Sequence, residues 1–217
     1  MRAIDQSFSI PRTPVAIIDC GDAPEAGAIR GLLENMGAVV TMHLPGTPGD
    51  FLLALGQGEL APEFVIICGH GDENGIVFGE YAPGIDTSGL VAGALPARAL
   101  AGKIALPGRV VLSTACDSGA EDFARTFLDG GVRAYIGPLS SPDATDALLF
   151  VHHFFHNILR RGVTSKAAWL RARSYDEESG TFMYYSACDV AAEAAAGLPA
   201  LRCDPAAPGN DAGGGAG

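Results

Sequence analysis

The chain has 217 residues, 48% of them hydrophobic, which is enough for a folded domain with a full core and excludes an intrinsically disordered chain. Its formal net charge of −11 excludes a typical nucleic-acid-binding protein, because the 14 Lys and Arg residues form no basic cluster in the sequence. No apolar stretch approaches the roughly 20 residues of a membrane span, so the composition predicts a globular protein that does not enter a membrane.

Apolar runs alternate with amphipathic stretches along the chain, and this alternation predicts a parallel sheet covered by helices on both faces. Strands are expected at residues 14–19, 38–43, 64–68, 109–114, 133–136 and 182–187. Helices are expected before Gly37 and at residues 50–55, 120–128, 147–159 and 165–173. The predicted fold is an α/β three-layer sandwich with a mostly parallel central sheet.

Residues 72–108 interrupt this alternation with a Gly- and Pro-rich path, in which residues 75–79 resemble a small ribbon. An excursion of this length after a strand is often functional. We expect one domain over residues 14–190, with a leader over residues 1–13 before it. The C-terminal segment over residues 191–217 is expected to be largely disordered from about residue 205, where Pro, Gly and Ala prevail.

Two of the predicted strands end in side chains that can carry chemistry. The third strand is followed by Gly69-His70-Gly71, and the fourth by Ala115-Cys116-Asp117. In open α/β sheets, chemistry takes place just past the carboxyl ends of the strands. A thiol and an imidazole at adjacent strand ends are the minimum needed for a cysteine nucleophile with a histidine base. Taken singly, each residue also has a simpler interpretation, as a loop histidine bonded to backbone and as a buried structural cysteine.

The five cysteines include no CxxC pair, which predicts free thiols rather than a disulfide framework or a zinc site. Cys20 and Cys68 fall in apolar strands, where a cysteine acts as a small hydrophobe. Cys188 and Cys203 have no partner motif. Residues 1–6 lack a signal-peptide core, so a cytoplasmic location is expected.

The two strand ends together resemble the caspase–hemoglobinase fold, the clan that includes caspases, gingipains, clostripain, legumain and separase. In that clan a strand ending in His-Gly, here His70-Gly71, precedes a strand ending in Ala-Cys, here Ala115-Cys116. Within the clan, residues 112–119 and the segments that follow them are most similar to bacterial CHAT-type peptidase domains. The resemblance covers about residues 14–190 and implies a caspase-like sheet with flavodoxin-like strand order. It departs from the family pattern at residues 137–142, where CHAT domains usually carry a Trp-Pro pair.

The resemblance implies a cysteine endopeptidase that needs no cofactor and no metal. Cys116 would attack a peptide carbonyl and His70 would protonate the leaving amine. The backbone N–H groups of Gly71 and Cys116 would hold the oxyanion. The partners implied are a protein or peptide substrate and a regulatory protein, with no nucleic acid and no membrane.

Acidic residues near the strand ends are candidates for substrate binding. Asp19 ends the first strand and Asp22 follows it, Asp117 follows the cysteine, and Asp143 lies after the fifth strand. A carboxylate in the pocket for the residue before the scissile bond would favour Arg or Lys. Asp22 has an equally simple alternative role, because Asp22 and Glu25 have the spacing of a capping box at the start of a helix.

Three histidines fall on one predicted helix. His152 and His156 are four residues apart, a spacing that can chelate a metal, but no HExxH pattern accompanies them. Together with His153 they are expected to be solvated or partner-facing, with no metal bound. The arginines that follow in the sequence are expected to be scattered helix charges.

Other functional classes remain open at this point. A catalytically silent pseudopeptidase or partner-binding module on the same fold would show no selective reactivity at Cys116. A Rossmann-like ligand binder is disfavoured, because the chain has neither a GxGxxG fingerprint nor a P-loop. An α/β-hydrolase is disfavoured because its nucleophile elbow needs flanking glycines that Cys116 lacks.

Overall fold

The computed structural model describes residues 12–21 and 23–188. Six strands form one sheet in the order β2-β1-β3-β7-β8-β9, in which every pair is parallel except the antiparallel pair of β8 and β9. In that order the strands are β2 (Ala38–His43), β1 (Thr13–Cys20), β3 (Phe64–Gly69), β7 (Val110–Ser113), β8 (Ala134–Pro138) and β9 (Phe182–Ser186). The predicted mostly parallel sheet with flavodoxin-like order is thus confirmed, with an antiparallel strand at one edge.

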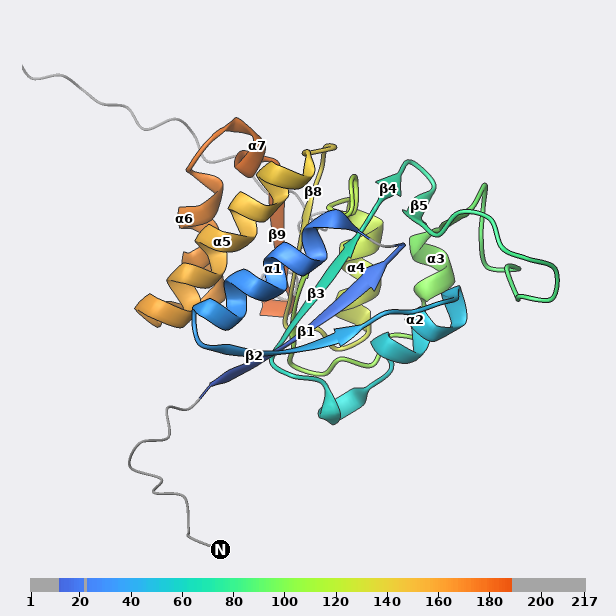
Figure 1. The fold of residues 1–217 in the computed structure, drawn as a ribbon, viewed down its shortest axis with the longest axis horizontal. Coiled ribbons are helices and arrows are strands. Elements are labelled where there is room, and N and C mark those ends of the chain that lie inside the picture. The colour runs from blue at the N-terminus through green and yellow to red at the C-terminus, as the bar shows by residue number, and fades with distance from the viewer. Residues whose placement is uncertain (1–11, 22, 189–217) are drawn as a thin grey trace, which may run out of the picture.

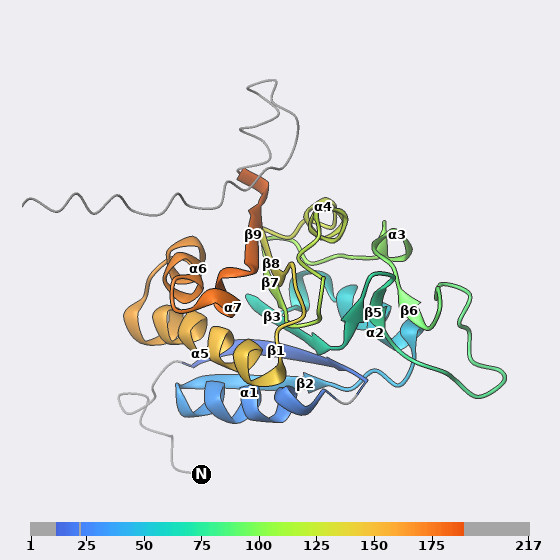
Figure 2. The same cartoon turned by 90° about the horizontal axis from the view of Figure 1, so that it is seen from above.

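Helices cover both faces of the sheet and complete three layers (Figures 1 and 2). One face is covered by α1 (Pro24–Asn35), α5 (Ala144–Arg161) and α6 (Ser165–Arg173). The other face is covered by α2 (Pro48–Leu55), α3 (Ala97–Leu100) and α4 (Glu121–Asp129). Because successive strand residues point to opposite faces, Val15 and Ile17 of β1 join the first core, and Ala16 and Ile18 join the second.

The apolar stripe predicted for residues 147–159 forms the buried face of α5. Ala147, Val151 and Phe154 are fully buried against the sheet. The helix begins at Asp143, whose carboxylate accepts hydrogen bonds from two N–H groups of the first turn, and it ends at Gly162 with φ of 63°. Among the described residues, no helix combines the length and the apolarity needed to cross a bilayer.

A second, smaller sheet follows β3 and lies beside the main one (Figure 1). It contains β4 (Gly71–Asp72), β5 (Gly75–Val77) and β6 (Ala94–Leu95), all antiparallel to their neighbours. The ribbon predicted at residues 75–79 is therefore one strand of a three-stranded unit. Two short helices, η2 (Gly58–Leu60) and α7 (Glu177–Gly180), complete the described elements.

Candidate active site

His70 and Cys116 lie at the same edge of the sheet, each just past a strand. β3 ends at Gly69 and β7 ends at Ser113, and the two strands are parallel neighbours. In their register, Phe64 pairs with Val110 and Ile67 with Ser113, an offset of 46 positions in both pairs. The same offset, if continued past the strand ends, would bring His70 to the level of Cys116.

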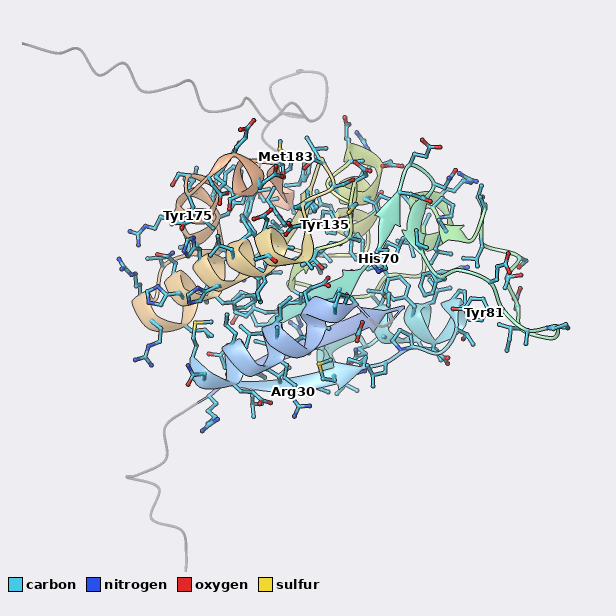
Figure 3. All side chains as sticks on the ribbon, turned by 45° about the horizontal axis from the view of Figure 1, so that its top comes forward. Arg30, His70, Tyr81, Tyr135, Tyr175 and Met183 are labelled. Carbon is cyan, nitrogen blue, oxygen red and sulfur yellow. The ribbon has the colours of Figure 1, made fainter. Side chains whose placement is uncertain are left out.

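The glycines on either side of His70 allow close contact with two neighbouring chain segments. A Cβ atom at Gly71 would overlap the carbonyl oxygen of Cys116 and lie 2.9 Å from its backbone nitrogen. A Cβ atom at Gly69 would lie 2.9 Å from the carbonyl oxygen of Cys20. Since only glycine lacks a Cβ atom, both positions require it. The loop that carries the exposed His70, which is labelled in Figure 3, is therefore in backbone contact with Cys116.

Buried hydroxyl groups hold the turn that carries Cys116. The Ser118 hydroxyl donates to the carbonyl oxygen of Ala115 at 2.6 Å and lies 2.8 Å from the Ser113 hydroxyl. The Tyr135 hydroxyl, from β8, donates to the carbonyl oxygen of Ser118 at 2.9 Å. Burial raises the pKa of Tyr135, so this hydroxyl keeps its proton and remains a donor.

The last strand of the sheet and the loop after β8 also hold this turn. The Tyr185 hydroxyl of β9 donates to the carbonyl oxygen of Gly119 at 2.8 Å. Asp117 has φ of 58°, in the left-handed region, and its N–H donates to Ser140 O at 3.2 Å. A non-glycine residue in this region stores strain that the surrounding contacts must hold, and such residues cluster at functional sites.

The backbone N–H of Cys116 is not used by the fold. The N–H groups of Ala115, Asp117, Ser118 and Gly119 all donate to acceptors of the described chain. Within that part of the chain, no such acceptor is found for the N–H of Cys116. It is therefore available to a ligand oxygen above the turn.

Two buried acidic residues lie below this edge of the sheet. The Asp19 carboxylate accepts a hydrogen bond from the Ala23 N–H at 2.8 Å. Glu25, 8% exposed, accepts a hydrogen bond from the Thr114 hydroxyl at 2.8 Å. The capping box expected from Asp22 and Glu25 is wrong, because the N-cap of α1 is Ala23 without a side-chain cap, and Glu25 points inward instead.

The four substrate-binding candidates have different surroundings. Asp19 is buried, whereas Asp117 is half-buried beside Cys116. Asp143 is exposed, and its carboxylate caps α5. Asp22 lies outside the described residues.

The thiols fall into two groups. Cys20 and Cys68 are buried, and burial together with nearby carboxylates raises their pKa values, so both stay protonated and unreactive. Cys116 is half-buried at the strand end, and Cys188 is exposed. Cys203 lies outside the described residues. The expectation that Cys20 and Cys68 are core residues is confirmed.

Sequence reasoning did not find Glu25, Thr114, Tyr135 or Tyr185. Tyr135 carried a usable signal, because a buried tyrosine needs a partner for its hydroxyl and the nearest loop is the one that carries Cys116. As for metals, the described part of the chain contains no group of three or more His, Cys, Asp or Glu residues arranged to hold an ion.

Neither a protein-family model nor a curated protein sequence matches the chain. Several solved structures, in contrast, are similar to it. The Arg-specific cysteine proteinase gingipain R is similar with a TM-score of 0.52 and 13% identity, over 80% of this chain and 46% of that one. The Porphyromonas gingivalis RgpB pro- and mature-domain complex gives a TM-score of 0.51 and 13% identity, over 80% of this chain and 47% of that one.

A eukaryotic structure shows the same likeness. The Saccharomyces cerevisiae separase–securin complex gives a TM-score of 0.52 and 12% identity, over 83% of this chain and 12% of that one. The chain thus spans less than half the length of either of these proteins. At such identity the likeness concerns the fold alone. It shows that this chain shares the α/β fold of the gingipain and separase structures.

Proposed function

We propose that the protein is a cysteine endopeptidase in which Cys116 is the nucleophile and His70 the general acid and base. The observation that carries this proposal is the backbone contact between Gly71 and Cys116 at the carboxyl ends of two adjacent parallel strands. This contact supports the proposal because it joins the loop that carries His70 to the turn that carries Cys116, although the two are far apart in the sequence. The similar cysteine peptidase folds support the same assignment.

The Cys116 thiol first gives its proton to His70, and the sulfur then attacks the carbonyl carbon of the scissile peptide bond and forms a C–S bond. The carbonyl oxygen becomes an oxyanion that accepts hydrogen bonds from the Cys116 N–H, which has no acceptor among the described residues, and from the Gly71 N–H. His70 then gives a proton to the leaving amine as the C–N bond breaks. Water attacks the acyl-enzyme while His70 takes its proton, and the C–S bond breaks to release the acid.

For specificity, we propose that the substrate carries Arg or Lys before the scissile bond. Asp19, Glu25 and Asp117 all lie at or below the edge of the sheet that carries Cys116. Carboxylates there favour a cationic side chain. A panel of fluorogenic peptides that differ at this one residue measures the preference. Faster cleavage after Asp or after an apolar residue would contradict the basic preference without touching the Cys116 assignment.

The proposed activity is tested by comparing the wild-type chain with Cys116→Ala and His70→Ala on a mixed fluorogenic peptide library. Each substitution is expected to lower kcat/KM by at least about a thousandfold, since each removes a partner of the bond-making step. Cys188→Ala is the matched control, because it removes an exposed thiol away from the site. Normal cleavage by either site variant would show the assignment to be wrong.

The alternative is a partner-binding module on the same fold. The separase structure is a complex with securin, and the RgpB structure is a complex of pro- and mature domains. Proteins with similar folds thus form complexes with protein partners. An electrophilic peptide probe separates the two functions. A peptidase labels at Cys116 and loses the label in His70→Ala, whereas a silent module shows no selective labelling. We also propose that the chain is related to CHAT-type peptidase domains. In this proposal it cleaves a protein substrate, has a regulatory protein partner and acts in the cytoplasm.

A further inference from the structure

One long segment of this acidic chain contains no acidic residue. Between Asp146 and Asp176 there is no Asp or Glu, although the chain as a whole carries 25 of them. The same stretch holds five of the 14 Lys and Arg residues and three of the five His residues. It forms nearly all of α5 and all of α6, the two helices that pack side by side on one face of the sheet (Figure 1).

Arg161 and Arg171, two of the arginines expected to be scattered helix charges, line one depression between these helices. Its volume is about 640 Å³. It is lined by His152, His153, His156, Arg161, Arg171 and Tyr175, with Asn157 and Ser174. Tyr175 is 58% exposed and lies well apart from His70 (Figure 3), so the depression is separate from the proposed active site.

Arg171 is held in place at the wall of the depression. Its Nη1 donates to Asn157 Oδ1 at 3.0 Å, and the buried Asn157 amide in turn donates to the carbonyl oxygen of His153 at 2.8 Å. The His153 ring packs edge-on against Tyr175, with 4.3 Å between ring centroids. A guanidinium fixed at one nitrogen keeps its other N–H donors for a ligand and loses little conformational freedom on binding.

The charge in the depression is positive and not neutralised. The four ion pairs found in the described chain involve Arg30, Arg109, Arg125 and Arg133, not the arginines of the depression. Burial and the neighbouring histidines lower the pKa of His153, against the opposite effect of Asp176. This lowered pKa disfavours the charged form of His153, whereas Arg161 and Arg171 are charged at any physiological pH. Two guanidinium groups repel a metal ion and attract an anion.

We propose that this depression binds a carboxylate-rich segment of a partner protein. Arg171 and Arg161 would pair with Asp or Glu side chains, for which the planar guanidinium has a matching geometry. The exposed Tyr175 and Leu170 lie on or near α6 and would contact the apolar residues between those carboxylates. This inference does not depend on the proposed peptidase activity, because it uses none of the same residues.

Charge over the rest of the molecule favours an acidic peptide over a nucleic acid. A nucleic acid would extend its phosphates beyond the depression and meet a chain whose net charge is −11. A short peptide segment keeps its carboxylates within the depression. Screening over about 8–10 Å at physiological salt then shields it from the acidic remainder of the surface.

The test is fluorescence anisotropy with a short fluorescein-labelled peptide in which Glu alternates with Leu. The full chain carrying Cys116→Ala is used, so that cleavage of the probe cannot affect the result. We expect saturable binding that weakens as salt is added. Arg171→Gln and Arg161→Gln should each weaken it by about tenfold, because each removes one charge-assisted contact.

Arg125→Gln is the matched control. It removes one exposed arginine from α4, on the opposite face, and should leave the affinity within about twofold. Thermal unfolding checks that Arg171→Gln still folds, and Arg161→Gln tests the depression without disturbing Asn157. The proposal is overturned if the double variant binds as well as the wild type, if a Gln-for-Glu peptide binds equally, or if a DNA oligonucleotide binds more tightly than the acidic peptide.

Discussion

The two loops that meet at the edge of the sheet are held in different ways. The turn after β7, which carries Cys116, is fixed from below by hydroxyl groups of Ser118, Tyr135 and Tyr185. The loop after β3, which carries His70, is fixed by backbone contacts: Gly71 touches Cys116, and the His70 carbonyl accepts from the Val77 N–H at 2.9 Å. The turn that carries Cys116 is thus held by side chains of the core, whereas the loop that carries His70 is held by that turn and by β5.

This difference has a consequence for the proposed chemistry. Contacts through buried side chains stabilise the position of the nucleophile even when no substrate is bound. The position of the proposed base, His70, depends instead on the contact at Gly71 and on the small sheet of β4, β5 and β6. Between β5 and β6 the chain passes through the largely exposed segment 79–92. Substitutions in the loop that carries His70 should therefore act mainly on the catalytic geometry. Substitutions below the turn that carries Cys116 should also lower the stability of the fold.

Among substitutions that leave Cys116 and His70 in place, the largest effect is expected from Gly71→Ala. The new Cβ atom would overlap the Cys116 carbonyl, so the two loops must separate by a sizeable fraction of an ångström or more. Displacement of a catalytic group by about 1 Å lowers the rate by roughly a hundredfold. We expect kcat to fall by about that factor, as measured with the fluorogenic peptide that the wild type cleaves best.

Gly31→Ala is the control for this substitution. Gly31 lies in α1, and a Cβ atom there has no neighbour within 4 Å. It should leave kcat unchanged and raise stability by about 0.5–1 kcal/mol through its higher helix propensity. Equal activity of Gly71→Ala and Gly31→Ala would mean that the contact at Cys116 does not position the base.

A smaller effect is expected from Tyr135→Phe, on the other side of the comparison. The ring stays stacked on Phe127, with 4.6 Å between centroids, but the Ser118 carbonyl loses its buried partner. A buried polar group left without a hydrogen-bond partner costs about 1–3 kcal/mol. The free energy of unfolding measured with urea should therefore fall by that amount. We expect kcat to fall by about tenfold with little change in KM, because the turn loosens while the binding surface remains.

Tyr175→Phe serves as the control, since its hydroxyl is on the surface and away from the turn. It should change neither the unfolding midpoint nor kcat. If Tyr135→Phe lost stability but kept full kcat, the hydroxyl network would have a purely structural role.

These particular residues show which features the sequence could predict. The strands were predictable because runs such as residues 64–68 are continuously apolar, as buried parallel strands are. That His70 and Cys116 lie at one edge of the sheet could be predicted, because carboxyl ends of neighbouring parallel strands share an edge. The strand β9 was predicted as a strand, but its antiparallel direction depends on where the chain returns after α7.

The missed features depend on which way a side chain points. Glu25 has the spacing of a capping residue, and sequence spacing does not distinguish that role from an inward hydrogen bond to Thr114. The Tyr185 partner is a backbone carbonyl, which every residue has. Arg161 and Arg171 lie on different helices and meet only because of how α5 and α6 pack.

The smallest effect is expected from the buried thiol of Cys68 in β3, which contrasts with the thiol of Cys116 just past β7. Cys68 has a raised pKa because of burial first and the Glu25 charge second, so the folded state favours the protonated thiol. That stabilisation is complete below the ordinary thiol pKa of about 8.5 and is lost as the pH rises through the folded-state value. The unfolding free energy of the wild type should therefore fall above about pH 9 by up to roughly 1.4 kcal/mol per pH unit more than that of Cys68→Ala.

Iodoacetamide at neutral pH should modify Cys116 and Cys188 but not Cys68, as seen by peptide mass mapping. Rapid modification of Cys68 in the folded chain would show that the edge of the sheet opens, and the contrast between the two thiols would then be lost.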